Sequence, residues 1–293
     1  MYNRGNAMEI TDENIKAYVK YLSGLGLDIT VHRDKPVNAS EFFADLNVHS
    51  NPYCLLVKSK KQAWDKCISC QKNVMKEAGL GIPFEGMCYA GVWEYVFPMS
   101  EAGFLCVSGY RKDEKKAQAR MEKLCEKYGH DKNELKNTYE KYLNPDIPDF
   151  HFVKTLIYPL LAMFSLYYKN SPEAARKGIF ETNADYIYSH ALWYIKNNFS
   201  DKITLEKLCA FCHCSPSYIS HIFKTASGKS INAFTNELRL KEAADILSKE
   251  SMSVTDTALA VGFSDTNYFS NLFKKAYGVS PSEYKKTKRS NRK

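Results

Sequence analysis

Hydrophobic residues in the last third of the chain recur at helical spacing, and one such pattern occurs twice. The segment Ser217–Lys224 (SYISHIFK) is matched fifty residues later by Asn267–Lys274 (NYFSNLFK). Each copy is followed at the same offset by a glycine, Gly228 or Gly278. A segment repeated at this spacing predicts two similar helical units in tandem.

Each unit contains the signals of a short helix, a tight turn and a second helix. In the first, Thr204 caps a helix over Leu205–Cys212, and Ser215 caps the helix that carries the repeated segment. In the second, Gly262 supplies the turn and Ser264 or Asp265 the cap. This order is typical of a helix-turn-helix, whose second helix enters the major groove of DNA. An array of helical hairpins used only for packing is the alternative interpretation.

The first 169 residues alternate between helical and strand patterns. Helices are expected at 12–25, 53–78 (as a pair), 113–128, 131–143 and 149–169, and strands at 27–31, 87–98 and 103–110. The pattern predicts a multidomain chain, with an α+β domain followed by an all-α domain. The expected divisions are a first domain over 1–169, a linker over 170–182, a helical domain over 183–286 and a basic tail over 287–293.

Composition and charge agree with two packed domains and an anionic partner. The 293 residues are 44% hydrophobic, and the net charge is +8, of which +6 lies from Asn183 onward. This positive excess favours nucleic acid and argues against packing alone. The apolar stretch Phe152–Tyr168 contains Lys154 and is shorter than a bilayer requires, so we expect a buried helix rather than a membrane span.

The N-terminus and the cysteines favour a cytoplasmic protein. The first residues are polar and carry Glu9, Asp12 and Glu13, which does not match a signal peptide. The cysteine count is nine, an odd number, which in a chain without an export signal indicates reduced thiols.

The helical period also predicts which side chains face DNA. Ile219, Ile222 and Phe223 point into the core, so the polar residues between them face outward. The expected DNA-binding residues are Ser217, Ser220, His221 and Lys224 on the first helix, and Thr266, Asn267, Ser270, Asn271 and Lys274 on the second. Asparagine suits an adenine edge, whereas lysine suits phosphate. Arg239, on the helix between the units, is expected to brace the two halves.

The sequence here resembles the AraC/XylS transcription regulators. The resemblance rests on three segments, which are 238–247 (LRLKEAADIL), 260–275 (AVGFSDTNYFSNLFKK) and 277–284 (YGVSPSEY). It covers about 184–286 and implies a bacterial, sequence-specific regulator of transcription that binds double-stranded DNA and contacts RNA polymerase. Activation is what the resemblance favours over repression.

Cysteines are the sharpest chemical feature of the first domain. Cys67 and Cys70 have the spacing of a metal-binding or redox pair, and Cys54 and Cys88 complete a set of four thiols. Three interpretations stay open: buried filler, ligands of a metal ion or iron–sulfur cluster, and a thiol redox sensor. No phosphate loop, nucleophile elbow or paired histidine motif occurs, so we expect no enzyme activity.

The first domain resembles the PocR-type sensory domain. The resemblance covers about 10–168 and rests on 51–59 (NPYCLLVKS), Cys67, Cys70, 88–92 (CYAGV) and 103–110. It implies a PAS-like fold that senses a small organic molecule, polyols being the named example. Aromatic residues near the expected strands are candidate pocket walls, namely Tyr89, Trp93, Tyr95, Phe97 and Phe104. Glu94 is expected on the opposite, exposed face.

Together these patterns predict a ligand-responsive transcription regulator. The first domain would bind a small effector and alter how the second presents its two helices to DNA. The alternative has the same DNA-binding output, with a metal or redox signal sensed through Cys54, Cys67, Cys70 and Cys88. The helix at 149–169 is a candidate homodimer interface.

Overall fold

The computed structural model describes residues 10–33, 46–78, 81–99, 103–170, 183–249 and 252–290. The chain divides into two compact units, Met1–Ser189 and His190–Lys293, with the boundary inside a helix. The expected linker, 170–182, lies almost wholly outside the described residues.

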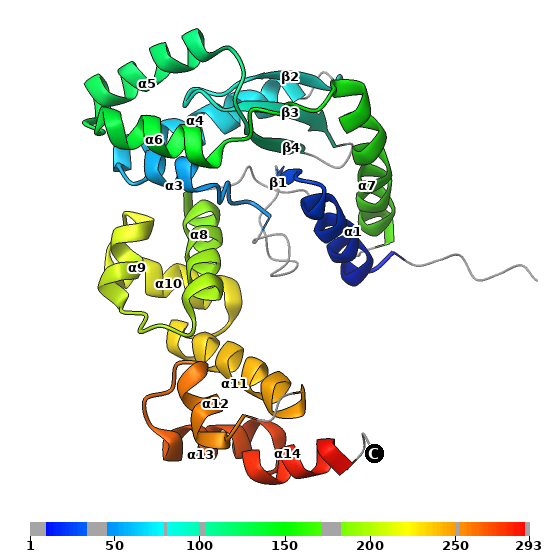
Figure 1. Ribbon diagram of the computed structural model, residues 1–293, viewed down its shortest axis with the longest axis vertical. Coiled ribbons are helices and arrows are strands. Elements are labelled where there is room, and N and C mark those ends of the chain that lie inside the picture. The colour runs from blue at the N-terminus through cyan, green and yellow to red at the C-terminus, as the bar shows by residue number, and fades with distance from the viewer. Residues whose placement is uncertain are drawn as a thin grey trace, which may run out of the picture. The chain divides into compact units, whose positions relative to one another are not determined.

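The N-terminal unit is built on a four-stranded antiparallel sheet (Figure 1). Its strands are β1 (Asp28–Arg33), β2 (Phe84–Met87), β3 (Trp93–Pro98) and β4 (Gly103–Tyr110), in the order β1-β4-β3-β2. Thr30, Val96 and Cys106 are paired across adjacent strands. Because side chains alternate along a strand, this row faces one side of the sheet, and the neighbouring row, Ile29, Tyr95 and Val107, faces the other.

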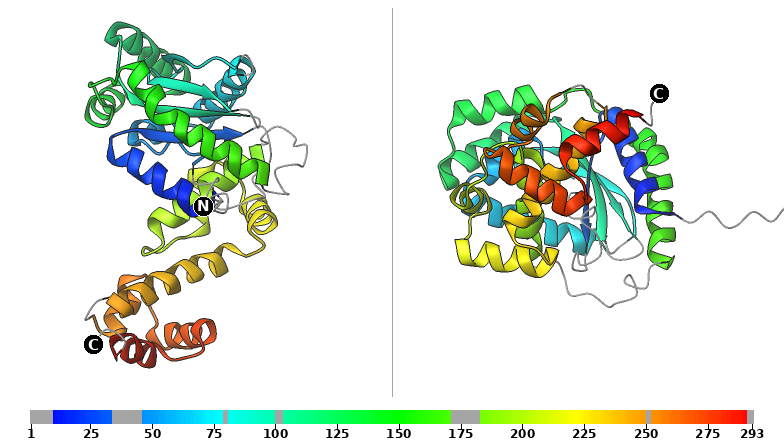
Figure 2. Two further views of the ribbon diagram at one scale, coloured as in Figure 1. Left: turned by 90° about the vertical axis from the view of Figure 1, so that its right-hand side faces the viewer. Right: turned by 90° about the horizontal axis from the view of Figure 1, so that it is seen from below.

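Two long helices cover the side of the sheet that carries Tyr95. Helix α1 (Asp12–Gly24) and helix α7 (Phe150–Asn170) pack side by side there (Figures 1 and 2). The Tyr95 ring stacks on Phe150 at 5.5 Å, and the Tyr110 hydroxyl donates to the Gly26 carbonyl at 3.1 Å. The other side is covered by α3 (Pro52–Lys58) and α4 (Lys61–Ala78).

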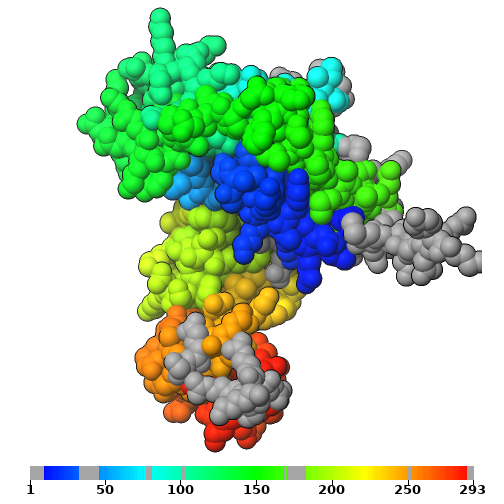
Figure 3. Space-filling model, turned by 45° about the vertical axis from the view of Figure 1, so that its right-hand side comes forward, coloured from blue at the N-terminus to red at the C-terminus, as the bar shows by residue number. Residues whose placement is uncertain are grey.

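Helix α7 is less buried than its composition suggested. Only 22% of Phe150–Tyr167 is buried, and by length and composition alone the helix could cross a membrane. Our prediction of a buried helix was therefore wrong. Val153, Ile157, Leu160 and Phe164 form the buried stripe of the helix, whereas Phe152, Tyr158 and Leu166 are exposed. In the space-filling view α7 lies at the surface beside α1 (Figure 3).

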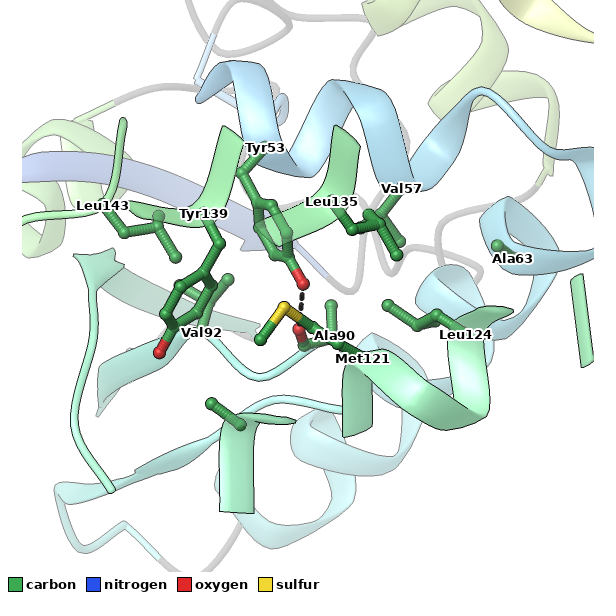
Figure 4. Packing of buried hydrophobic residues seen from close by; sticks show 11 residues of the cluster. Tyr53, Val57, Ala63, Ala90, Val92, Met121, Leu124, Leu135, Tyr139 and Leu143 are labelled. Carbon is green, nitrogen blue, oxygen red and sulfur yellow. Dashed lines mark hydrogen bonds between the residues drawn. The ribbon is translucent and has the colours of Figure 1, made fainter. Parts of the chain in front are cut away.

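A second hydrophobic cluster joins α3 to α5 (Glu114–Tyr128) and α6 (Lys132–Tyr142) (Figure 4). Tyr53 and Tyr139 meet edge to face at 5.3 Å between ring centres. The Tyr53 hydroxyl donates to the Ala90 carbonyl at 2.8 Å, so this buried polar group has a partner. The cluster fixes α3 and the turn after β2, which both contribute to the site described below.

The C-terminal unit consists of helices in the part of the chain that the structure describes. They are the part of α8 (Asn183–Asn198) from His190 on, and then α9 (Leu205–Cys212), α10 (Pro216–Ser227), α11 (Ile231–Lys249), α12 (Val254–Ala260), α13 (Thr266–Tyr277) and α14 (Pro281–Ser290). The predicted fold class is confirmed: a small antiparallel sheet with helices, then an all-helical domain. Part of the expected basic tail is helical, since α14 continues to Ser290.

Candidate nucleic-acid interface and buried pocket

Each repeated segment forms the second helix of a capped pair. Ser215 accepts a hydrogen bond from the Tyr218 backbone at 3.4 Å and so starts α10. Asp265 does the same for α13, accepting from Asn267 and Tyr268 at 2.8 and 3.0 Å. These caps satisfy backbone N–H groups that a helix start leaves without partners. Of the two predicted caps for the second unit, the structure selects Asp265.

The buried and exposed faces of these two helices follow the predicted period. Ile219, Ile222 and Phe223 are buried in α10, and Phe269 and Phe273 in α13. Seven of the nine predicted DNA-facing residues are exposed, which are Ser217, Ser220, His221, Lys224, Asn267, Asn271 and Lys274. The other two, Thr266 and Ser270, are half-buried. The Ser270 hydroxyl donates to the Thr266 carbonyl at 2.8 Å, so it is already engaged within its own helix.

Arg239 connects the two helix pairs. Its Nε donates to the Phe199 carbonyl at 2.7 Å and its Nη2 to the Asp201 carbonyl at 2.9 Å. The guanidinium also lies 5.6 Å from the centre of the Phe263 ring, which belongs to the second pair. Since its donors point into this junction, Arg239 has the bracing position that we expected from the sequence.

A cavity of about 720 Å³ lies in the N-terminal unit against the side of the sheet that carries Val96 and Cys106. Its walls come from β2, β3 and β4, from the turn after β2, and from α3, α4 and α5. Such a volume is in the range of cavities that hold small organic molecules. The apolar part of the wall includes Val74, Phe84 and Leu124.

The pocket lies on the other side of β3 from the one we expected. Of the five predicted aromatic wall residues, Tyr89 and Phe104 line the cavity, whereas Trp93, Tyr95 and Phe97 do not. Tyr95 and Phe97 instead pack against Phe150 beneath α7. Because side chains alternate along β3, the other two residues of this stretch, Glu94 and Val96, point into the cavity.

Glu94 corrects a second expectation, because it is not on an exposed face. It lines the cavity, and the Cys106 thiol donates to its carboxylate at 3.7 Å. Burial raises the pKa of Glu94 to about 7, against the smaller opposing effects of the Cys106 thiol and the Arg120 guanidinium.

The four predicted cysteines all line this cavity, and Cys106 joins them. Burial raises the pKa of Cys54 to about 12 and that of Cys67 to about 11, and it also raises the pKa of Cys70 and Cys88. Redox-active thiols have lowered pKa values, so the structure gives the redox alternative no support. Across the described residues, no three His, Cys, Asp or Glu side chains converge closely enough to hold a metal ion.

Two histidines and a lysine form a polar end of the cavity. His32 and His49 approach each other at 3.0 Å between Nε2 atoms, and Thr30 Oγ1 lies 2.9 Å from His49. The Lys58 ammonium donates to the His49 carbonyl at 3.0 Å. Burial lowers the pKa of His32 to about 3 and also lowers the pKa of His49 and Lys58, so both imidazoles are neutral near pH 7.

Sequence reasoning missed these three residues and Arg120 on α5, which also lines the cavity. One weak signal was available for Lys58, because it directly follows the apolar run Leu55–Val57 and is the last residue of the same short helix. No comparable signal marks Arg120, which stands in a strongly charged segment.

The titration of Glu94 predicts a pH dependence of stability. Its pKa is higher in the folded chain than its ordinary value of 4.5, so its contribution is fully present below 4.5 and is lost as pH rises through about 7. Urea unfolding of the wild type and Glu94→Gln should therefore agree at about pH 4, below the ordinary value. At about pH 8 the wild type should have lost stability relative to the variant. Parallel loss in both proteins would show that Glu94 is not the group responsible.

Comparison with known proteins agrees with this arrangement. A family model described as a helix-turn-helix domain matches residues 208–287. The chain is 25% identical over 270 residues, 88% of its length, to the regulatory protein PocR of Salmonella typhimurium, of which it covers 86%.

Two further matches cover smaller parts of the chain. The bifunctional transcriptional activator and DNA repair enzyme AdaA of Bacillus subtilis is 34% identical over 92 residues, which are 31% of this chain and 44% of AdaA. The C-terminal domain of AraT, a response regulator from Geobacillus stearothermophilus, is 36% identical over 34% of this chain and 84% of that structure, with a TM-score of 0.33. The C-terminal unit therefore contains an AraC-type helix-turn-helix domain, and the chain is similar to PocR over most of its length.

Proposed function

We propose that the protein is a cytoplasmic transcription regulator that binds double-stranded DNA through α10 and α13 in response to a small organic molecule. The observation that carries the proposal is the pair of capped second helices with exposed polar faces, Ser217–Lys224 and Asn267–Lys274. Arg239, at the junction of the two helix pairs, and the buried residues around it hold α10 and α13 in one unit. Both helices can therefore read one DNA site.

The cavity of the N-terminal unit is the proposed effector site. It combines an apolar wall with a small number of buried polar groups, which is the usual composition of a small-molecule site. Similarity to PocR, a protein named as regulatory, supports a role in control rather than in catalysis. A homodimer formed through α7 and contact with RNA polymerase for activation are further parts of this proposal.

A route from the cavity to the C-terminal unit runs through α4. One face of α4 lines the cavity with Cys67, Cys70 and Val74. The adjacent face of α4 packs through Trp64 and Ile68 against Tyr186, in the first turn of α8. Since α8 continues to Asn198 and buries Leu192 and Ile195 in the core, a shift of α4 would act on a helix that both units share.

Tyr186→Ala is expected to weaken this coupling. The buried ring is 1% exposed, so its loss leaves a cavity against Trp64 and Ile68 and frees the start of α8. An effector should still bind the variant, but the change in DNA affinity that it causes should shrink. Fluorescence anisotropy on labelled DNA, with and without effector, measures both quantities. An unchanged response would exclude this contact as the route.

The proposed function is tested on the full chain with a panel of small polyols, aldehydes and amines. DNA for the assay is selected from a random pool, and each compound is then scored for its effect on the affinity of the protein for that DNA. At least one compound should change the affinity, because an effector must favour one of two states. Compounds that raise the melting temperature and never change DNA affinity would contradict the proposal.

A further inference from the structure

The charges that line the cavity are unequal. Five side chains in the wall are cationic, namely Lys58, Lys66, Arg120, Lys123 and Lys127, and only Glu85 and Glu94 are acidic. Lys66, Lys123 and Lys127 are exposed to solvent, whereas Lys58 is buried and Arg120 is half-buried. The exposed cations raise the local concentration of anions, and the two that water screens less favour an anionic occupant over a neutral or cationic one.

The two carboxylates oppose an anion less than their number suggests. Glu85 accepts a hydrogen bond from the Trp93 indole at 3.1 Å and lies 3.5 Å from the Lys112 ammonium, so its charge is engaged away from the cavity. Glu94 accepts from the Cys106 thiol. Its raised pKa, about 7, means that much of it is protonated near neutral pH.

Arg120 is held in place through one nitrogen of its guanidinium, and its other hydrogen-bond donors are not used by the described residues. Its Nη1 donates to the carbonyls of Met87 and Cys88, in the turn after β2, which fixes the guanidinium against the cavity wall. Among the described residues, no carboxylate lies within the 4.0 Å of a salt bridge to Arg120, and its Nε and Nη2 donate to no protein group. A guanidinium with two free, coplanar donors is suited to a bidentate carboxylate.

The rest of the wall requires an apolar body on the ligand. Val74, Phe84, Val96, Phe104 and Leu124 surround the same space, and its volume of about 720 Å³ exceeds what a three-carbon molecule fills. A small hydrophilic anion would leave this surface wet, whereas an alkyl or aryl chain would bury it.

Building on the proposed effector site, we propose that the cavity binds an amphipathic organic anion, with its carboxylate on Arg120 and its apolar chain against Phe84, Phe104 and Leu124. The cations Lys123 and Lys127, on the same helix as Arg120, would attract the anion to the cavity.

A matched series of probes on the full chain tests this proposal. The series is 4-phenylbutyrate, 4-phenylbutanol and 4-phenylbutylamine, which share one apolar body and differ in charge. Thermal shift and calorimetric titration should show binding of the carboxylate, weaker binding of the alcohol and none of the amine. Arg120→Gln should weaken carboxylate binding roughly tenfold or more and leave alcohol binding unchanged. Lys115→Gln removes an equal charge from an exposed position on α5 outside the cavity and should change neither.

Two results would overturn the anion proposal. One is binding of the alcohol or amine as tight as that of the carboxylate, and the other is no binding of any probe in the series. Either result leaves the effector proposal itself standing if a polyol, aldehyde or amine of the earlier panel changes DNA affinity. The series on the unaltered protein decides the question even if Arg120→Gln does not fold.

Discussion

Replacing Gly262 with alanine is expected to lower the free energy of unfolding of the C-terminal unit by about 2–4 kcal/mol. Gly262 has a φ of +94°, in the left-handed region where a side chain is strained. A Cβ at this position would also lie 2.5 Å from the Ser200 carbonyl oxygen and 2.9 Å from its carbon. Both groups are backbone, so neither can move aside without disturbing the turn after α8.

Gly228→Ala is the matched control for this substitution. Gly228 has a similar φ, +72°, but a Cβ there would meet no atom within 4 Å. It should therefore cost only about 1 kcal/mol, the penalty of the backbone conformation alone. Urea unfolding followed by circular dichroism measures both variants. Equal destabilisation would mean that the close contact with Ser200 does not exist in solution.

The Gly262 variant also tests how the two helix pairs are joined. Ser200 lies between Phe199 and Asp201, whose carbonyls accept from Arg239. Loss of the close packing at Gly262 should loosen this junction, so DNA affinity should fall together with stability. Intact affinity in a folded but destabilised variant would show that the two helices read DNA without the junction.

Asn271→Ala is expected to weaken binding to the selected DNA site by about 1–3 kcal/mol and to relax the preference at one base pair. The side chain is exposed near the middle of α13, on the face opposite Phe269 and Phe273. An asparagine amide can donate to and accept from adenine at once, and alanine can do neither. Titration against the selected site and against single-base variants of it gives both effects.

Lys274→Ala is the control that separates base reading from phosphate contact. Lys274 is exposed on the same helix, one turn from Ser270. Its loss should weaken binding to all sequences alike and lower the salt dependence of binding by about one ion. If Asn271→Ala behaves in the same way as Lys274→Ala, α13 does not read bases at this position.

The C-terminal unit could be predicted closely because its signals are local. Caps such as Thr204 and Ser215, the turn glycines and the apolar period lie within a few residues of the structure that they produce. Even the bracing position of Arg239 could be expected from its place on α11, between the two helix pairs. The half-burial of Thr266 and Ser270 could not, and neither could the hydrogen bond that Ser270 donates to the Thr266 carbonyl.

The site in the N-terminal unit was harder to predict because its decisive contacts are distant in sequence. The strand pattern predicted that side chains alternate along β3. It did not show on which side of the sheet the helices would leave a cavity. That choice depends on α7, which packs Phe150 against Tyr95 from more than fifty residues away. The pattern likewise placed Cys54, Cys67, Cys70 and Cys88 in one set, but it did not show that Glu94 and Arg120 share their cavity.

The central claim is that α10 and α13 of one protein read different bases of one DNA site. Selection of DNA sites from a random pool tests it most directly. The selection is run with the wild type, His221→Ala and Asn271→Ala, and the enriched sequences are compared. The wild type should enrich an asymmetric site with two groups of preferred base pairs about one helical turn, roughly 10 base pairs, apart. Each substitution should relax one group only. No enriched sequence, or the same group relaxed by both substitutions, would contradict the account.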